Sequence, residues 1–385
     1  MRPMSMETAL DTLLQRVHTA RQNGTPLAIR GGGTKAFHAY PVDGELLDTR
    51  GLTGVISYEP SELVVTVGAG TPLVELETLL RSQGQCLPFE PPHFTWSQAA
   101  GTATVGGMVA AGLAGPARAN VGGVRDYVLG AKIINGLGQH LSFGGQVMKN
   151  VAGYDVSRLM VGSLGTLGII TEVSLKVLPL APARATLCFE LPQARALAQL
   201  HRWGGKPLPL NASCWVRDDS TPGGPAPELL FVRLRGAAAA VQAATQTMLR
   251  DVPGLQMDNA QTDGDWDLCR DQQLPFFTQA PEGTVLWRLS LPQTAAVLEL
   301  PWPQLVEWHG ALRWLWAPRS AGEQLKQSAA SAGGTASVFM VPGQTNACQE
   351  KLQVQDAASA AIHARLKASF DPQGLFNPAL SPRAA

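Results

Sequence analysis

Hydrophobic positions near the start of the chain recur at the spacing of a helix. In METALDTLLQRVHTARQNG, residues 6–24, one face is formed by Leu10, Leu13, Leu14 and Val17. The segment lacks the long apolar core of a secretory signal peptide. It predicts an amphipathic helix that belongs to the folded chain, and with it a cytoplasmic protein.

A second helix is marked by signals at both ends. Thr71 suits an N-cap, Pro72 suits the first helical position, and Gly84 can end the helix. Leucines at positions 73, 76 and 80 supply its apolar face. We therefore predict a helix between Thr71 and Gly84 that packs on a hydrophobic core.

Short runs rich in β-branched residues alternate with helical patterns along the whole chain. In the first half they predict strands at 27–30, 63–67, 129–135 and 168–177, with a hairpin turn at 136–138. In the second half they predict strands at 185–191, 228–235 and 284–291, and helices at 195–203, 237–250 and 349–369. This mixture predicts an α+β protein.

Two shifts in composition indicate a domain boundary near Leu180. Sixteen of the forty glycines lie between positions 101 and 168, whereas eight of the nine tryptophans lie after position 200. The run LPLAPAR between these regions has the prolines of a linker, and 385 residues are enough for two domains. The late tryptophans are expected in a core, unless an exposed cluster at 302–316 forms a docking surface.

Charge and potential metal ligands exclude several functional classes. Thirty Lys and Arg balance thirty Asp and Glu, so no overall field attracts nucleic acid. The five cysteines form no CxxC pair and the seven histidines no HxxxH spacing, so we expect no metal site and no iron–sulfur cluster. Positions 91–117 carry no charged residue, but they hold few of the large aliphatic residues that drive membrane insertion. We expect no transmembrane segment.

The first candidate binding segment is RGGGTK, residues 30–35, directly after a predicted strand. Its three glycines can leave backbone N–H groups free to bind a diphosphate, and Arg30 and Lys35 add positive charge. The chain has no GxxxxGK[ST] loop and no Rossmann fingerprint. Taken alone, the segment is explained equally well as a flexible turn.

Two further glycine-rich segments follow in the same half of the chain. AGTATVGGMVAAGLAGP, residues 100–116, has mostly small side chains that let the backbone approach a large flat ligand, although close packing of elements would need the same. VGSLGTLGIIT, residues 161–171, places glycines at 162, 165 and 168 before a predicted strand. Three such segments together favour a common ligand.

These segments, in this order, resemble the FAD-binding domain of the vanillyl-alcohol-oxidase or p-cresol-methylhydroxylase (PCMH) superfamily. The resemblance extends to VGAG at 67–70, TVGGMVAAG at 104–112, VRDYVLG at 124–130 and KNVAGYD at 149–155. The closing FDPQGLFNP, residues 370–378, is similar to the C-terminal signature FDPxGxxNP. Within the superfamily, the chain most resembles the FAD-binding (E) subunits of glycolate oxidases.

The resemblance implies a domain organisation and a set of cofactor contacts. It implies a two-lobed PCMH-type FAD-binding domain at 1–180, a smaller α/β cap domain at 181–345, and a C-terminal helix and segment at 346–385 that return to the FAD domain. The diphosphate would lie between the first loop and the central glycine-rich segment. The implied contact residues are Gly31, Gly32, Gly33, Thr34, Lys35, Thr104, Gly106, Gly107, Gly162, Gly165, Thr166, Gly168, Ile170 and Asn377.

The departures from the family pattern are as informative as the matches. Covalent members carry a histidine directly after the glycines of the first loop, where this chain has Thr34, so we expect non-covalent FAD and a turn or surface role for His38. Leu164 replaces a usual acidic residue. The HxGDGNxH-like motif of relatives that oxidise 2-hydroxy acids is missing. No catalytic residue is assigned, and His363 is either a base near the flavin or a half-exposed helix residue.

Two further residues lie near the expected cofactor region, and their roles are not decided by the sequence. Tyr154 could pack in the core of the FAD domain, and Arg158 could pair with a carboxylate.

For the whole chain the resemblance implies an FAD-dependent oxidoreductase subunit that takes part in flavin-mediated electron transfer during glycolate oxidation. Its partners would be a catalytic flavoprotein subunit and an iron–sulfur subunit, with any membrane association through them. The alternatives are a self-sufficient FAD-dependent 2-hydroxy-acid dehydrogenase with a different substrate pocket, and a non-catalytic assembly subunit.

Overall fold

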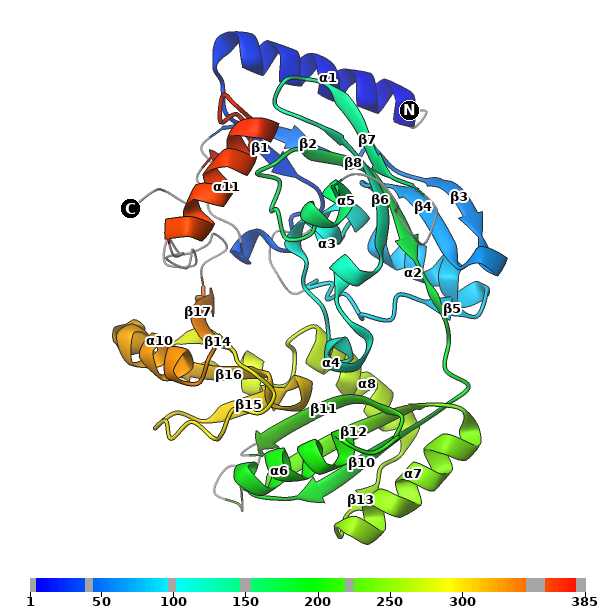
Figure 1. Cartoon of the computed structure of the whole chain (residues 1–385), viewed down its shortest axis with the longest axis vertical. Coiled ribbons are helices and arrows are strands. Elements are labelled where there is room, and N and C mark those ends of the chain that lie inside the picture. Colours follow the sequence, from blue (N-terminus) through cyan, green and yellow to red (C-terminus); the bar gives the residue numbers. More distant parts are fainter. Residues whose placement is uncertain are drawn as a thin grey trace. The chain divides into compact units, whose positions relative to one another are not determined.

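The chain forms two structural units, and each unit is built from more than one segment of the sequence. The structure, a computed structural model, describes residues 5–38, 44–95, 102–145, 154–218, 224, 226–343 and 357–378. The first unit comprises Met1–Leu113, Gly123–Pro179 and Gln344–Ala385, and the second comprises Ala114–Gly122 and Leu180–Gly343 (Figure 1). The domain boundaries predicted at 180 and 345 stay predictions. The units differ from them at Ala114–Gly122, which belongs to the second unit.

The first unit contains an antiparallel sheet of five strands in the order β3-β4-β8-β6-β7. The strands are β3 (Val55–Glu59), β4 (Val64–Gly68), β8 (Ile169–Lys176), β6 (Val128–Ile134) and β7 (His140–Gly144). The hairpin predicted at 136–138 joins β6 to β7. Its turn is held by the Asn135 side chain, whose Oδ1 accepts hydrogen bonds from the backbone N–H groups of Leu137 and Gln139.

Two short pairs of strands and several helices complete the first unit. β1 (Leu27–Arg30) and β2 (Glu45–Asp48) are parallel, whereas β5 (Gln85–Cys86) and β9 (Leu178–Pro179) are antiparallel. The α-helices are α1 (Met6–Asn23), α2 (Leu73–Ser82), α3 (Val105–Ala111), α5 (Val156–Leu159) and α11 (Ala357–Phe370). Three 3-10 turns are η1 (Ala36–His38), η2 (Pro60–Glu62) and η3 (Val124–Asp126).

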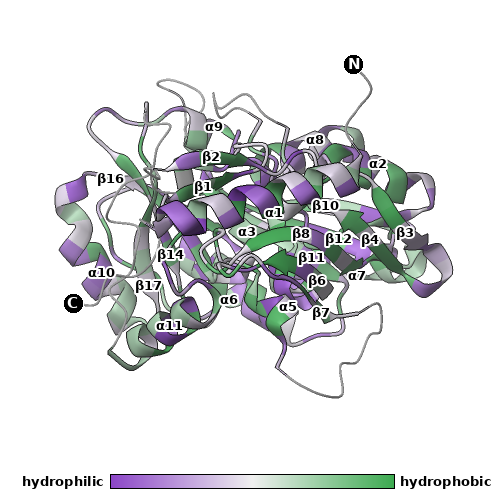
Figure 2. Ribbon diagram, turned by 90° about the horizontal axis from the view of Figure 1, so that it is seen from above, coloured by the Kyte–Doolittle hydropathy of each residue, from purple (hydrophilic) through white to green (hydrophobic). Residues whose placement is uncertain are grey.

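Helix α1 forms as predicted and covers the start of the first unit. Ser5 caps it, with its Oγ accepting a hydrogen bond from the N–H of Thr8. Leu13 and Val17 are buried against residues of β1 and against Phe376 near the C-terminus. Figure 2 shows that α1 carries both hydrophilic and hydrophobic residues, whereas β3 and β4 are mainly hydrophobic. The helix therefore joins the two ends of the chain in one core.

Helix α2 begins one residue later than its end signals predicted. Thr71 is not the cap, because its hydroxyl donates to the carbonyl oxygen of Gly68 at 2.7 Å, and Pro72 occupies the N-cap position instead. The predicted apolar face is confirmed: Leu73, Leu76 and Leu80 are buried.

The second unit is built on an antiparallel sheet of eight strands, in the order β13-β10-β12-β11-β15-β16-β14-β17. These strands are β13 (Leu255–Gln256), β10 (Ala183–Glu190), β12 (Glu228–Gly236), β11 (Leu210–Arg217), β15 (Gln304–Glu307), β16 (Leu312–Ala317), β14 (Val285–Ser290) and β17 (Thr335–Met340). Helices and strands alternate as predicted. Because every described pairing is antiparallel, the sheet is of the α+β rather than the α/β type.

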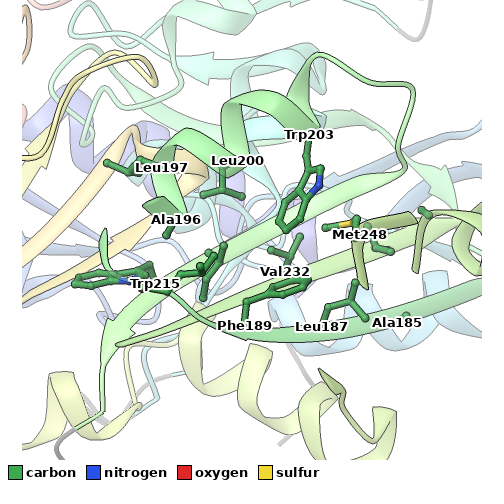
Figure 3. Packing of buried hydrophobic residues seen from close by; sticks show 14 of the residues in the cluster. Ala185, Leu187, Phe189, Ala196, Leu197, Leu200, Trp203, Trp215, Val232 and Met248 are labelled. Carbon is green, nitrogen blue, oxygen red and sulfur yellow. Dashed lines mark hydrogen bonds between the residues drawn. The ribbon is translucent and has the colours of Figure 1, made fainter. Parts of the chain in front are cut away.

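The helices of the second unit cover the sheet from both faces. They are α4 (Arg118–Val121), α6 (Gln193–Gly204), α7 (Ala238–Asp251), α8 (Asn259–Arg270), α9 (Pro275–Thr278) and α10 (Gly322–Ser331), with the 3-10 turns η4 (Trp308–Gly310) and η5 (Arg319–Ala321). Helices α6 and α7 pack on one face through Trp203, Phe189 and Val232 (Figure 3). Helix α8 meets the opposite face, where Trp266 Nε1 donates to Thr186 Oγ1 at 3.0 Å.

Seven of the eight late tryptophans are buried, and Trp302 is partly buried. The prediction of a core role for them is confirmed. Among the helices that the structure describes, none combines the length and the apolar content needed to span a bilayer. The described residues also contain no group of three or more His, Cys, Asp or Glu side chains able to hold a metal ion.

Candidate cofactor site

The RGGGTK loop follows β1 and contains a row of backbone N–H groups that have no acceptor among the described residues. Within the described chain, the N–H groups of Gly31, Gly32, Gly33 and Thr34 donate to no other group. Gly33 has a φ of 76°, which glycine adopts without strain, and its carbonyl oxygen accepts from the N–H of Ala36 at 3.0 Å. Such a row of unused amides is suited to bind an anion.

Cationic side chains flank this loop. The guanidinium of Arg30 lies against Gly33, where a Cβ atom would be 2.7 Å from its Nε. Lys35 Nζ lies 3.5 Å from Thr34 Oγ1 and 5.5 Å from the centroid of the Phe94 ring. Thr34 is buried. The loop therefore combines neutral donors with two positive charges.

The second glycine-rich segment packs directly on this loop. A Cβ atom on Gly31 would lie 2.5 Å from Thr104 Oγ1, and one on Gly32 would overlap the carbonyl oxygen of Thr102. Thr104 caps α3 by accepting from the N–H of Gly107 at 3.2 Å, and the N–H of Gly106 donates to the carbonyl oxygen of Ala69 at 2.7 Å. These two glycines thus permit close packing, and their own amides are already bonded within the chain.

The third segment docks on the end of α3. The N–H of Gly162 donates to the carbonyl oxygen of Val109 at 3.0 Å, and that of Leu164 donates to Ala110 at 2.9 Å. Leu164 has a φ of 51°, which is costly for leucine. Ser163 Oγ is buried without a hydrogen-bond partner in the described part of the chain.

The strand after this segment begins at Ile169. A Cβ atom on Gly168 would lie 2.9 Å from the carbonyl oxygen of Ile134. Thr166 donates its hydroxyl to the carbonyl oxygen of Ser163 at 2.7 Å, and Ile170 is buried opposite Ile133. These residues therefore support the segment mainly through packing and local hydrogen bonds.

Asn377 ties the first and third segments together. Its Oδ1 accepts from the N–H of Ile29 at 2.9 Å, and its Nδ2 donates to the carbonyl oxygen of Leu164 at 2.7 Å. Its own N–H donates to the carbonyl oxygen of Leu27 at 3.1 Å. A Cβ atom on Gly165 would lie 2.7 Å from Asn377 Nδ2. The side chain thus links β1, which precedes the RGGGTK loop, to the segment at 162–168.

Lys367 is a further link that the sequence did not indicate. Its Nζ donates to the carbonyl oxygens of Thr166 and Phe376 at 2.7 and 2.8 Å, and to Asp371 Oδ2 at 2.6 Å. Asp371 belongs to the FDPQGLFNP motif and is fully buried. The Lys367–Asp371 spacing of one helical turn is too common to have been recognised as a signal.

The first unit therefore brings the three predicted segments and Asn377 together. Four backbone amides and one serine hydroxyl lack partners among the described residues. These donors are suited to a diphosphate and other polar groups of a dinucleotide. The adjoining glycines lie where added side chains would clash with the neighbouring segment. This donor set fits FAD.

Other residues discussed from the sequence have different positions. Tyr154 is 96% exposed, so it is not a core residue. Arg158 pairs with Asp155, with its Nε 3.3 Å from Oδ2. His363 is exposed on α11. The side chain of His38, the KNVAG part of the KNVAGYD motif at 149–153, and Trp96 lie outside the described residues.

Comparisons with known proteins also indicate FAD. A family model described as "FAD binding domain" matches residues 8–144. Glycolate oxidase subunit GlcE of Escherichia coli (strain K12) is 44% identical over 368 residues, which cover 95% of this chain and 95% of that protein. The chain belongs to the GlcE family. The predicted family is thereby confirmed, and the FAD-binding domain implies FAD as the cofactor.

A second relative matches over a shorter region. Glycolate oxidase subunit GlcD of Bacillus subtilis (strain 168) is 32% identical over 168 residues, which cover 43% of this chain and 34% of that protein. A solved structure of alkyldihydroxyacetonephosphate synthase matches with a TM-score of 0.65 at 14% identity, over 96% of this chain and 75% of that chain. This likeness shows the fold alone, and together with the family model it confirms the predicted α+β class with an FAD-binding domain.

Proposed function

We propose that this chain is the FAD-binding subunit of a glycolate oxidase complex and takes part in flavin-mediated electron transfer during the oxidation of a 2-hydroxy acid. Membership of the GlcE family, over nearly the whole length of both chains, supports the proposal. The observation that carries it is the row of unused amides at Gly31–Thr34, packed on Thr102 and Thr104 and tied to the 162–168 segment through Asn377.

In this proposal the first loop binds the diphosphate of FAD. The N–H groups of Gly31 to Thr34 donate to its oxygens, and Arg30 and Lys35 offset its negative charge. Ser163 Oγ supplies a further donor. The remaining predicted residues shape the site: Thr104, Gly106 and Gly107 by close packing, Gly162, Gly165, Thr166, Gly168 and Ile170 by lining it, and Asn377 by holding two of its segments.

Non-covalent binding is part of the proposal. The hydroxyl of Thr34 stands where covalent relatives carry a histidine ring, and Thr34 is buried beside the loop. When bound, FAD supplies the redox chemistry, accepting and passing on electrons. The protein positions the cofactor and sets the charges around it, so this role requires no acid or base from the chain.

The missing HxGDGNxH-like motif supports a division of labour between subunits. We propose that a catalytic flavoprotein subunit oxidises the 2-hydroxy acid and that an iron–sulfur subunit carries electrons onward. Among the described residues, no group of three or more His, Cys, Asp or Glu side chains is placed to hold a metal ion.

Flavin content of the purified chain tests the proposed site. We expect a yellow protein with about one FAD per chain, released into the supernatant on acid precipitation. Gly32→Ala should lose most of its FAD, because the added methyl group would overlap the carbonyl oxygen of Thr102. Gly145→Ala is the matched control, because its Cβ would meet no atom of the described residues within 4 Å. Equal FAD content in the two variants would contradict the site.

Activity of the isolated chain separates the proposal from its alternatives. Under anaerobic conditions, glycolate or D-lactate should not bleach the flavin of the chain alone, but glycolate should do so when the partner subunits are added. Bleaching by the chain alone would indicate a self-sufficient dehydrogenase. A colourless wild-type protein that still assembles with its partners would indicate an assembly subunit.

A further inference from the structure

Two arginines in the second unit lie against one aromatic ring and form no ion pair with a described residue. The Cζ atoms of Arg118 and Arg288 lie 4.6 and 5.5 Å from the centroid of the Trp308 ring, and that of Arg288 lies 5.9 Å from the Trp314 ring. Within the described chain neither guanidinium makes a hydrogen bond or an ion pair. Arg288 Nε is buried and has no partner there. Buried arginine donors are normally satisfied.

The charge around this pair is not balanced. Burial lowers the pKa of Arg288 to about 10, and Arg118 lowers that pKa further than Glu307 raises it. The Glu307 carboxylate accepts hydrogen bonds from Trp314 Nε1 at 2.7 Å and from Cys269 Sγ at 3.4 Å. His309 adds no positive charge at neutral pH, because burial lowers its pKa to about 4. The local field is therefore positive and favours an anion.

The ring that carries both arginines is held by a strained turn. Trp308 and His309 have φ values of 51° and 56°, in the left-handed region that non-glycine residues avoid. Trp308 Nε1 donates to the carbonyl oxygen of Gly115 at 3.0 Å. His309 is fixed by Ser213, whose Oγ lies 3.0 Å from its backbone N and 2.8 Å from Nδ1. Backbone strain maintained by so many contacts is characteristic of binding sites.

The same contacts place Arg118 over the ring. Asn120, two residues after Arg118, donates from Nδ2 to the carbonyl oxygen of Asn211 at 2.9 Å and lies 2.6 Å from His309 Nε2. Arg118 itself is exposed. Arg288 pairs with Trp314 across β14 and β16, next to Trp287, which packs on the opposite face with α10. Arg288 and Trp314 thus lie on the sheet face opposite to the one that α10 covers.

We propose that Arg118 and Arg288, supported by Trp308, form a binding site for a small carboxylate. A planar guanidinium group can donate two parallel hydrogen bonds to the two oxygens of a carboxylate, and neither of these arginines uses its guanidinium in a hydrogen bond or an ion pair within the described chain. The site goes beyond the cofactor function of the first unit. Only the choice of a carboxylate over another small anion rests on the proposed function, whose substrate and product are carboxylates.

Binding to the FAD-loaded full chain tests the site without relying on turnover. Glycolate and glyoxylate are titrated while tryptophan fluorescence and the melting temperature are recorded, with ethylene glycol as an uncharged analogue and sulfate as a competing anion. We expect saturable binding of both carboxylates, a rise in melting temperature, and no response to ethylene glycol. Arg118→Gln and Arg288→Gln should each weaken binding at least tenfold.

Matched variants separate binding from folding. Arg195→Gln removes the same charge from an exposed position on α6 and should bind as the wild type does. Arg288→Lys keeps the charge but not the planar fork, and should fall between wild type and Arg288→Gln. If Arg288→Gln lowers the melting temperature without ligand, Arg118→Gln decides, because Arg118 is exposed.

Three results would overturn the site. They are the absence of saturable binding to the wild-type chain, equal binding by Arg118→Gln and wild type, and sulfate binding as tightly as glycolate. Flavin content, measured by absorbance in the same samples, reports on the proposed function separately. A chain that holds FAD but ignores carboxylates refutes only this inference.

Discussion

Lys367→Met removes the cation that joins α11, the FDPQGLFNP motif and the segment at 162–168. The Lys367 side chain is 16% exposed and its partner Asp371 is fully buried. The substitution keeps most of the aliphatic stem but leaves the carbonyl oxygens of Thr166 and Phe376 without this donor. It also leaves the Asp371 carboxylate without its positive partner.

The cost follows from what Asp371 retains. Breaking a buried ion pair by removing one partner costs roughly 3–5 kcal/mol. Asp371 still accepts from the N–H groups of Leu375 and Phe376, at 3.0 and 2.8 Å, and this favours the lower end. We expect the first unit to lose about 3 kcal/mol of stability, roughly a hundredfold in the unfolding equilibrium. FAD affinity should fall with it, because Thr166 belongs to the proposed cofactor site.

Urea denaturation combined with hydrogen exchange measures this effect. The amides of Leu375 and Phe376 should exchange faster in Lys367→Met, because they donate to the perturbed carboxylate. Lys132→Met is the control in the same unit: Lys132 pairs with Glu172 at 2.9 Å but is 41% exposed. Its loss should cost less than about 1 kcal/mol. If both variants lose the same stability, the reasoning from burial is wrong.

Two further predictions concern the second unit. The folded pKa of His309 is about 4, against roughly 6.5 for an unfolded histidine, so only the unfolded chain takes up this proton as the pH falls between those values. Stability should therefore decline over that interval by up to about 3 kcal/mol, and melting curves of His309→Gln should show a flatter pH profile. Trp203→Ala should cost about 3–5 kcal/mol in a denaturant titration, because Trp203 is fully buried against Phe189 and donates to Asp251 Oδ2 at 3.0 Å. The exposed Leu255→Ala control should change stability by less than about 0.5 kcal/mol.

Local patterns predicted the elements whose burial is one-sided. The leucines at 73, 76 and 80 face the core while the rest of α2 is largely exposed, so the helical period is visible in the sequence. Every residue of β16, LRWLWA, is buried, so no alternation marks it as a strand. The exact start of α2 was missed because the Thr71 hydroxyl donates to Gly68 instead of capping the helix.

The candidate site was predictable in its segments but not in its chemistry. Glycines at 31, 32 and 106 mark places where two backbones approach, and their clustering is visible in the sequence. Which amides stay free depends on tertiary partners: Gly106 donates to Ala69, whereas Gly32 donates to nothing within the described chain. The arginines at 118 and 288 are 170 positions apart, and no local pattern predicts that they meet at Trp308.

The excursion of Ala114–Gly122 into the second unit means that the polypeptide passes between the units four times, at 113/114, 122/123, 179/180 and 343/344. A truncated chain that begins at Leu180 would lack Gly115, the hydrogen-bond acceptor of the Trp308 indole, and Arg118, which stacks on it. Neither unit can therefore be isolated intact by truncating the chain at one position or by exchanging one continuous segment. Any chimaera with a relative has to carry the nine-residue excursion together with the sheet on which it docks.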